Sequence, residues 1–106
     1  LELKEQDFLY IPQTNLFFFR TDNQWGVIDP SANRLVRHEH SLWIPMIRLL
    51  DGVVIVEDDL KAESCDLSGQ KIHEVPVDPP WDATEYDDRI EYDSPVMGKH
   101  ILRLKR

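Results

Sequence analysis

The sequence has few of the residues that define several common protein classes. It holds one cysteine, Cys65, which excludes a disulfide within one chain and a cysteine-rich zinc module. Its four glycines stand apart from one another, so there is no glycine-rich phosphate loop. No stretch approaches the roughly 20 apolar residues of a transmembrane helix, and we expect no membrane insertion. Helical spacing is also missing, because Pro45 interrupts the nearest candidate.

Basic residues are scarce as well. The chain carries 12 Lys and Arg against 20 Asp and Glu, a formal net charge of −8. Residues 1–50 are nearly balanced, with six acids and five bases, whereas residues 51–106 hold fourteen acids and seven bases. Within 74–93 there are eight acids and one base. Nucleic acid is therefore a poor partner, and a basic protein is a favourable one.

A length of 106 residues is typical of one domain, and we expect a single domain over 1–106. No signal peptide or low-complexity linker is visible, which favours a cytoplasmic location. The first residue is Leu1, so a processed exported form and a fragment of a longer protein, such as a repeat segment of an envelope protein, both stay open.

An internal repeat emerges when the sequence is shifted by 37 residues. Leu16–Phe19 then lies over Val53–Val56, and the turn 31–35 over 68–72. A second shift places Ile90 over Leu16 and begins a shorter third copy. The predicted repeats are residues 8–43, 45–80 and 82–106.

Each copy has the composition of short β-strands. Asp51-Gly52 between two apolar runs is a strong β-hairpin signal. Four successive apolar residues in Leu16–Phe19 predict that both faces of that strand are covered. We therefore predict an all-β fold, an antiparallel β-hairpin meander of about ten strands. A closed small sandwich or trefoil-like barrel is the alternative, because it would remove exposed edges.

The segment Trp25-Gly26-Val27-Ile28-Asp29, with Ser31 and Arg34 after it, resembles the WG-repeat (KWG-repeat) family. The resemblance is good over residues 17–36 and partial over 54–75, where Ala62-Glu63 stands in place of Trp-Gly. It implies a scaffold of antiparallel hairpins, common in bacterial proteins, that binds other proteins without catalysis.

Three groups of residues could carry chemistry. His38-Glu39-His40 places two imidazoles on one face of a strand, but a zinc site needs further ligands, and we predict no metal. Glu57-Asp58-Asp59 is typical of a solvated turn. Cys65 occupies an inward position of the repeat, which favours a buried side chain over a nucleophile. We predict no catalytic residues and no cofactor.

The best candidates for partner binding are tryptophans near acidic residues. Trp81 lies in a proline-rich, acidic connection, and Trp43 lies in the preceding connection. An aromatic anchor with a charged rim is typical of a binding hot spot, whereas a lid over the core is the alternative for each tryptophan. The predicted partner-binding residues are Trp81, Trp43, Asp78, Asp82, Glu85, Asp87 and Asp88.

These observations favour a non-catalytic, acidic protein-binding module of unknown oligomeric state. One specific form is an immunity protein that neutralises a basic toxin or nuclease. The alternative is a small hydrolase or a carbohydrate-binding domain that uses its surface carboxylates.

Overall fold

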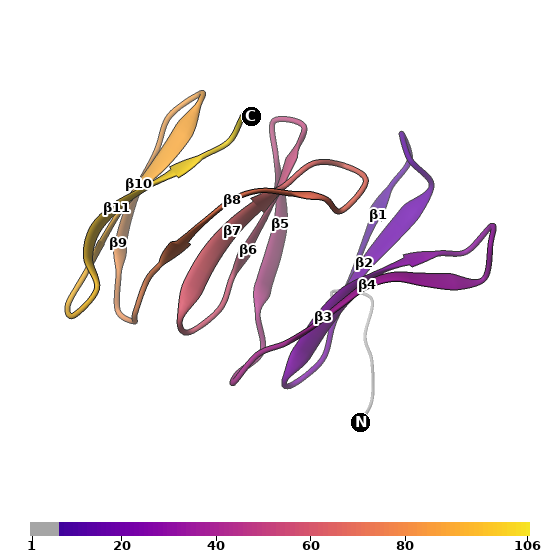
Figure 1. Cartoon of the computed structure of the whole chain (residues 1–106), viewed down its shortest axis with the longest axis horizontal. Coiled ribbons are helices and arrows are strands. Elements are labelled where there is room, and N and C mark those ends of the chain that lie inside the picture. Colours follow the sequence, from indigo (N-terminus) through magenta and orange to yellow (C-terminus); the bar gives the residue numbers. More distant parts are fainter. Residues whose placement is uncertain (1–6) are drawn as a thin grey trace.

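The computed structural model describes residues 7–106, and Leu1 lies outside this range. The described residues form eleven β-strands and no α-helix, so none of their elements is a helix able to cross a membrane. The strands make three antiparallel sheets in chain order (Figure 1). Sheet 1 contains β1 (Phe8–Ile11), β2 (Leu16–Arg20), β3 (Gln24–Asp29) and β4 (Arg34–His40). Sheet 2 contains β5 (Met46–Leu50), β6 (Val53–Glu57), β7 (Lys61–Cys65) and β8 (Lys71–Pro76). Sheet 3 contains β9 (Asp82–Glu85), β10 (Arg89–Ser94) and β11 (Gly98–Arg103).

The predicted all-β meander of hairpins is thus confirmed. Within each sheet, neighbouring strands are consecutive in the sequence, and the three sheets stay open without closing into a barrel. The 37-residue offset reappears in the strand positions, since β3 and β7 begin at Gln24 and Lys61, and β4 and β8 at Arg34 and Lys71. Even the β-bulge recurs, between Val27/Ile28 in sheet 1 and at the equivalent Ser64/Cys65 in sheet 2.

The turns follow the chemistry of their residues. Asp51 and Gly52 both have positive φ, as a tight two-residue hairpin turn requires. Asp29 and Asp66, which are 37 positions apart, each accept a hydrogen bond from the backbone N–H two residues later. Equivalent turns therefore use equivalent side chains in the first two sheets.

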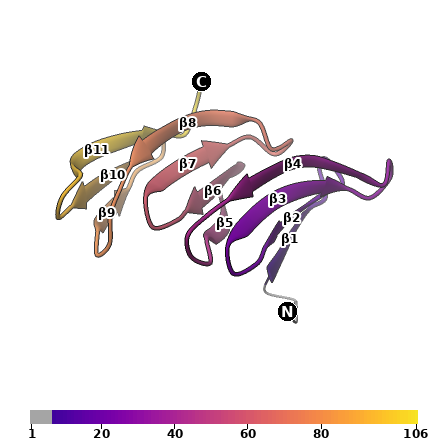
Figure 2. The ribbon, with the colours of Figure 1, turned by 60° about the horizontal axis from the view of Figure 1, so that its bottom comes forward.

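The three sheets stack face to face in chain order (Figure 2). The front face of each sheet is the one that points from sheet 1 toward sheet 3 along the stack, and the rear face is the opposite one. Layer 1 is the core between sheets 1 and 2, and layer 2 is the core between sheets 2 and 3. The buried residues of layer 1 are Ile11, Leu16, Phe18, Trp25, Val27, Val54, Val56 and Cys65. Those of layer 2 are Ile55, Ala62, Val75, Val77, Ile90, Tyr92, Leu102 and Leu104.

The third repeat departs from the first two. Its sheet has three strands, and its β10–β11 turn is one residue shorter, since three residues (95–97) separate the pair Ser94↔Gly98 while four (58–61) separate Glu57↔Ala62. Ile90 faces layer 2 as Val54 faces layer 1, both from a rear face, and it lies 36 rather than 37 positions after Val54. The predicted alignment of Ile90 with Leu16, a front-face residue, is therefore wrong by one position.

The two apolar runs differ in how they are covered. In β6, Val54 and Val56 fill layer 1 while Ile55 fills layer 2, so both faces are buried as predicted. In β2, Leu16 and Phe18 face layer 1, but Phe17 and Phe19 lie half-buried on the rear face of sheet 1. The prediction that both faces of β2 are covered is therefore wrong for the described chain, because no sheet lies behind sheet 1.

Candidate functional site

The predicted partner-binding acids play different roles. Asp78 accepts hydrogen bonds from the backbone N–H groups of Val96 (3.1 Å) and Met97 (2.7 Å), so its carboxylate holds the tip of the β10–β11 hairpin. Glu85 pairs with Arg48 at 2.5 Å, an ion pair that links β9 to β5. The carboxylate of Asp78 is thus occupied within the fold, whereas the Glu85 side chain stays 42% exposed in its ion pair.

The other three acids lie at the surface of sheet 3. Asp88 pairs with Arg89 at 2.9 Å, and both groups are substantially exposed. Asp82 and Asp87 are exposed and make no ion pair within residues 7–106. Of the predicted acids, Asp82 and Asp87 are therefore the ones whose charge is available to a partner.

The two candidate tryptophans differ in exposure. Trp81 is half-buried, packs against layer 2 and meets the Tyr92 ring edge-on, with centroids 6.3 Å apart. Its indole therefore acts as a lid over the core, the alternative considered from the sequence. Trp43 is 62% exposed, between the exposed side chains of Leu42 and Ile44. Of these two tryptophans, Trp43 is the exposed one, and it lies at the connection of sheets 1 and 2, away from the sheet 3 acids in sequence.

A shallow cavity of about 380 Å³ lies on the front face of sheet 3. Its lining adds Glu91 and Asp93 to the predicted Asp82, with Lys99 as the basic side chain among them. These residues alternate along β10 and β11, so the strand period that buries Ile90 and Tyr92 turns them outward. That alternation was present in the sequence and could have identified Glu91 and Asp93 as surface acids.

The histidine pair on β4 lies on the rear face of sheet 1. The His38 and His40 rings are 4.9 Å apart, and His38 Nε2 makes a 2.5 Å hydrogen bond with Gln24 Oε1. Within residues 7–106, no group of three His, Cys, Asp or Glu side chains has the geometry to hold a metal ion.

The acidic triplet 57–59 is buried, and the prediction of a solvated turn is wrong in this respect. Glu57 accepts a 2.5 Å hydrogen bond from the Tyr92 hydroxyl, across layer 2. Asp58 accepts backbone hydrogen bonds from Leu60 and Lys61, which closes the β6–β7 turn. The residues do form a turn, but all three are buried, and the carboxylates of Glu57 and Asp58 hold the fold, whereas Asp59 Oδ1 has no hydrogen-bond partner there.

Burial and the neighbouring Glu57 carboxylate raise the pKa of the Tyr92 hydroxyl. The phenol therefore stays protonated and donates a hydrogen bond to the Glu57 carboxylate throughout the neutral pH range. This hydrogen bond ties β10 of sheet 3 to β6 of sheet 2.

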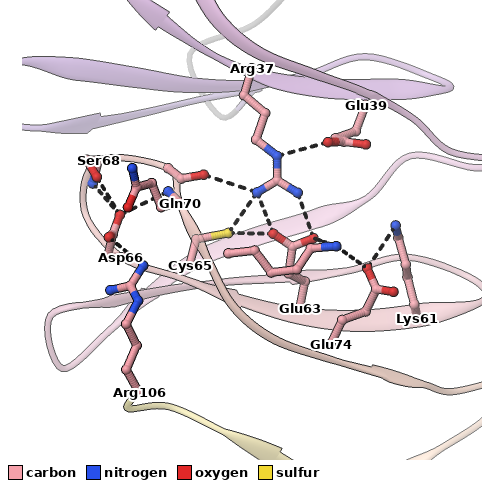
Figure 3. A network of polar contacts seen from close by, with 12 residues as sticks. Arg37, Glu39, Lys61, Glu63, Cys65, Asp66, Ser68, Gln70, Glu74 and Arg106 are labelled. Carbon is pink, nitrogen blue, oxygen red and sulfur yellow. Dashed lines mark hydrogen bonds and ion pairs between the residues drawn. The ribbon is translucent and has the colours of Figure 1, made fainter.

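The densest polar network lies in layer 1 and joins sheets 1 and 2 (Figure 3). Arg37 binds Glu63 through both terminal nitrogens, at 2.5 and 2.9 Å, and Glu63 is 1% exposed. The guanidinium also donates to Glu39 and to the Gly69 carbonyl oxygen, and it lies over the Trp25 ring at 4.6 Å. The pKa of Arg37 is raised: desolvation, the largest influence, lowers it, but the hydrogen bonds to Glu63 and Glu39 outweigh that effect.

Cys65 belongs to this network and is fully buried, as its inward repeat position predicts. Its Sγ lies 2.9 Å from Glu63 Oε2, to which the thiol donates. Burial and the Glu63 charge raise the pKa of the Cys65 thiol well above its usual range. The thiol is therefore protonated at neutral pH, which is the opposite of what a nucleophilic cysteine needs.

Local sequence reasoning missed the pairing of Arg37 with Glu63. The available signal was Glu63 at the position where the repeat has Gly26. At Gly26 itself a Cβ would lie 2.4 Å from the Arg37 carbonyl oxygen and 2.7 Å from the Phe19 ring. Sheet 1 thus needs the glycine at position 26, whereas sheet 2 carries the buried acid Glu63, whose charge requires a nearby cation.

Searches of protein-family models, curated proteins and solved structures find no match to this chain. The resemblance to the WG-repeat family therefore remains a prediction from residues 17–36 and 54–75.

Proposed function

We propose that the chain is a non-catalytic protein-binding module that contacts a basic partner through sheet 3. The observation that carries this proposal is the chemistry of the front face of that sheet. The front faces of sheets 1 and 2 carry core residues such as Phe18 and Ile55, whereas that of sheet 3 carries Glu91 and Asp93.

The charge of this region supports a basic partner. All four residues of β9 are exposed, and Asp82 and Asp87 lack ion-pair partners in the described structure. Unpaired surface carboxylates attract a cationic protein over a distance set by the ionic strength, which speeds its association. The buried acids Glu57 and Glu63 are engaged in the fold, which supports a binding role over a catalytic one.

An immunity protein that neutralises a cationic toxin or nuclease is the specific form that we favour. A nuclease needs a basic surface for its phosphate substrate. A domain with a local excess of carboxylates can cover such a surface in place of nucleic acid.

The test is capture of a partner from lysate of the source cells, followed by affinity measurement with matched variants. Asp82→Asn with Asp87→Asn removes two charges from sheet 3. Asp22→Asn with Asp51→Asn removes two exposed charges elsewhere, and asparagine suits the positive φ of Asp51. We expect about tenfold weaker binding of a basic partner by the first variant at low salt and no change for the second. Equal affinities for both variants would contradict the proposal.

The cavity on the front face of sheet 3 favours a second candidate, a carbohydrate-binding domain or small hydrolase. Its carboxylates Asp82, Glu91 and Asp93 could accept hydrogen bonds from sugar hydroxyls. Calorimetric titration with a glycan panel, repeated with Asp93→Asn, separates the candidates. Glycan binding that the variant abolishes would favour the second one.

A further inference from the structure

The rear face of sheet 1 is uncovered in the described chain, and apart from Gln24, His38 and His40 the residues that its strands place there are apolar or aromatic. Paired residues of neighbouring strands share a face, which places Phe8 beside Phe19, Tyr10 beside Phe17, and Leu35 beside Ile28. Phe8, Tyr10 and Leu35 are 41%, 43% and 53% exposed. The Tyr10 and Phe17 rings are 4.8 Å apart, and the Phe19 ring lies against the backbone of Gly26. Together they make a surface of aromatic and aliphatic side chains on sheet 1, which lies at one end of the stack (Figure 1).

The repeat shows what this kind of face does elsewhere in the molecule. Phe17 and Phe19 occupy the places that Val54 and Val56 hold in sheet 2, 37 residues later. Val54 is 0% and Val56 3% exposed, because sheet 1 packs over them. In sheet 3 the same rear-face places belong to Ile90 and Tyr92, which sheet 2 covers. A rear face of this repeat is thus a surface on which another sheet packs.

The opposite end of the stack is built differently. The front face of sheet 3 carries Glu91, Asp93 and Lys99, which suit contact with water. A polar outer face of this kind caps a terminal repeat. Head-to-tail packing of one chain on the next would bury these charges against aromatic rings, at a large desolvation cost. The partner for the rear face of sheet 1 therefore has to offer an apolar face of its own.

The charge distribution favours a second copy that approaches with its own sheet 1 end. Residues 7–40, which hold sheet 1, carry four acids and three bases, so the sheet 1 end is nearly neutral, whereas 51–106 carry fourteen acids and seven bases. Contact between two sheet 1 ends keeps the acidic halves of both chains apart, because they lie at opposite ends of the pair. Any other arrangement of two copies brings these like charges closer together.

We propose that the rear face of sheet 1 is a self-association surface, on which a second copy packs its own rear face about a two-fold axis. Such a contact is self-complementary and closes after two chains. The aromatic rings of both sheets interdigitate as in a β-sandwich. The proposal is independent of the partner that sheet 3 binds, since that surface stays open at both ends of the dimer.

The size of the face sets the concentration range for the test. Four strands spaced by about 4.8 Å and roughly six residues long cover about 400 Å². A typical stable interface buries about 800 Å² on each partner, so we expect a weak, micromolar dimer. Sedimentation velocity of the full chain from about 1 to about 200 µM spans this range.

Two matched substitutions distinguish this face from the other end. Leu35 and Ile101 are both 53% exposed, the first on the rear face of sheet 1 and the second on the front face of sheet 3. We expect wild type to dimerise with rising concentration, Leu35→Lys to weaken the dimer at least tenfold, and Ile101→Lys to leave it unchanged. Phe8→Lys is a second variant on the same face and should act like Leu35→Lys. Far-UV circular dichroism checks that each variant is folded.

A wild-type chain that stays monomeric throughout this concentration range would overturn the proposal. The rear face of sheet 1 would then be a surface for a sheet of another protein. A dimer that survives both Leu35→Lys and Phe8→Lys, or that only Ile101→Lys disrupts, would overturn it equally.

Discussion

Layer 1 and layer 2 both contain a glutamate that is almost completely withdrawn from water. In layer 1, Glu63 receives two hydrogen bonds from the Arg37 guanidinium. In layer 2, Glu57 receives one from the neutral Tyr92 hydroxyl, and the nearest cation, Arg48, is 3.7 Å away at the layer's edge. A buried carboxylate is tolerated only with strong donors, and the two layers meet this need with an ion pair and with a phenol.

The largest expected effect is in layer 1. Arg37→Met removes the guanidinium that binds Glu63 and leaves Lys71 Nζ, 4.0 Å away, as the nearby cation, so we expect a loss of about 3–5 kcal/mol in the free energy of unfolding, measured by urea denaturation. Arg37→Met with Glu63→Leu removes both charges and should recover most of that loss. Equal destabilisation by the single and double variants would show that the charge left on Glu63 is unimportant.

In layer 2 the corresponding change should cost less. Tyr92→Phe keeps the ring but removes the donor to Glu57, and we expect a loss of about 2 kcal/mol by the same measurement. Arg48 and solvent near the layer's edge can still stabilise the carboxylate. A loss as large as that of Arg37→Met would remove the distinction between the two layers.

A smaller effect is expected at Cys65, which supplies a secondary donor to Glu63 in layer 1. Cys65→Ala removes the thiol and should cost about 1 kcal/mol of unfolding free energy. Cys65→Ser keeps a donor at that position. If the hydrogen bond to Glu63 matters, Cys65→Ser will lose less unfolding free energy than Cys65→Ala. A smaller loss for Cys65→Ala would show that Cys65 contributes through apolar packing.

The smallest effect is a pH dependence confined to layer 2. The backbone N–H of Arg103 donates to His73 Nδ1 at 2.9 Å, which requires a neutral acceptor. Desolvation and the Arg103 charge lower the pKa of His73. The folded protein therefore resists protonation more than the unfolded chain does, and stability is lost as the pH falls below the ordinary histidine pKa of about 6.5. Thermal melts between pH 7.5 and 5 should show this decline, and His73→Asn, which keeps an acceptor, should flatten it.

Periodic and local features of this fold could be predicted from the sequence. The 37-residue offset anticipates the strand positions of sheets 1 and 2, and Asp51-Gly52 anticipates its hairpin. These predictions succeed because strand alternation and turn geometry depend on neighbouring residues. The offset does not hold at β10, where Ile90 lies 36 positions after Val54 and shares its rear-face position, whereas the predicted alignment placed it over the front-face Leu16.

Interactions between sheets could not be predicted in the same way. Arg37 and Glu63 are 26 positions apart, and no local pattern pairs them. Asp78 looked like a surface acid because its partners, the N–H groups of Val96 and Met97, carry no side-chain signature. The partner-binding role of the predicted acids stays a prediction. Asp82 and Asp87 make no ion pair in the described chain, Glu85 forms an exposed ion pair, and Asp78 holds the β10–β11 hairpin.

The hydrogen bonds of Asp78 have a consequence for the tolerance of the chain to insertion. Asp78 lies in the connection that leads from β8 to β9, yet it binds the far tip of the β10–β11 hairpin, and its own N–H donates a hydrogen bond to Ser94 Oγ at 3.3 Å. The length of this connection is thereby matched to the position of the hairpin. An added residue between Val75 and Trp81 would therefore shift the Asp78 carboxylate out of reach of the Val96 and Met97 N–H groups and release the hairpin tip.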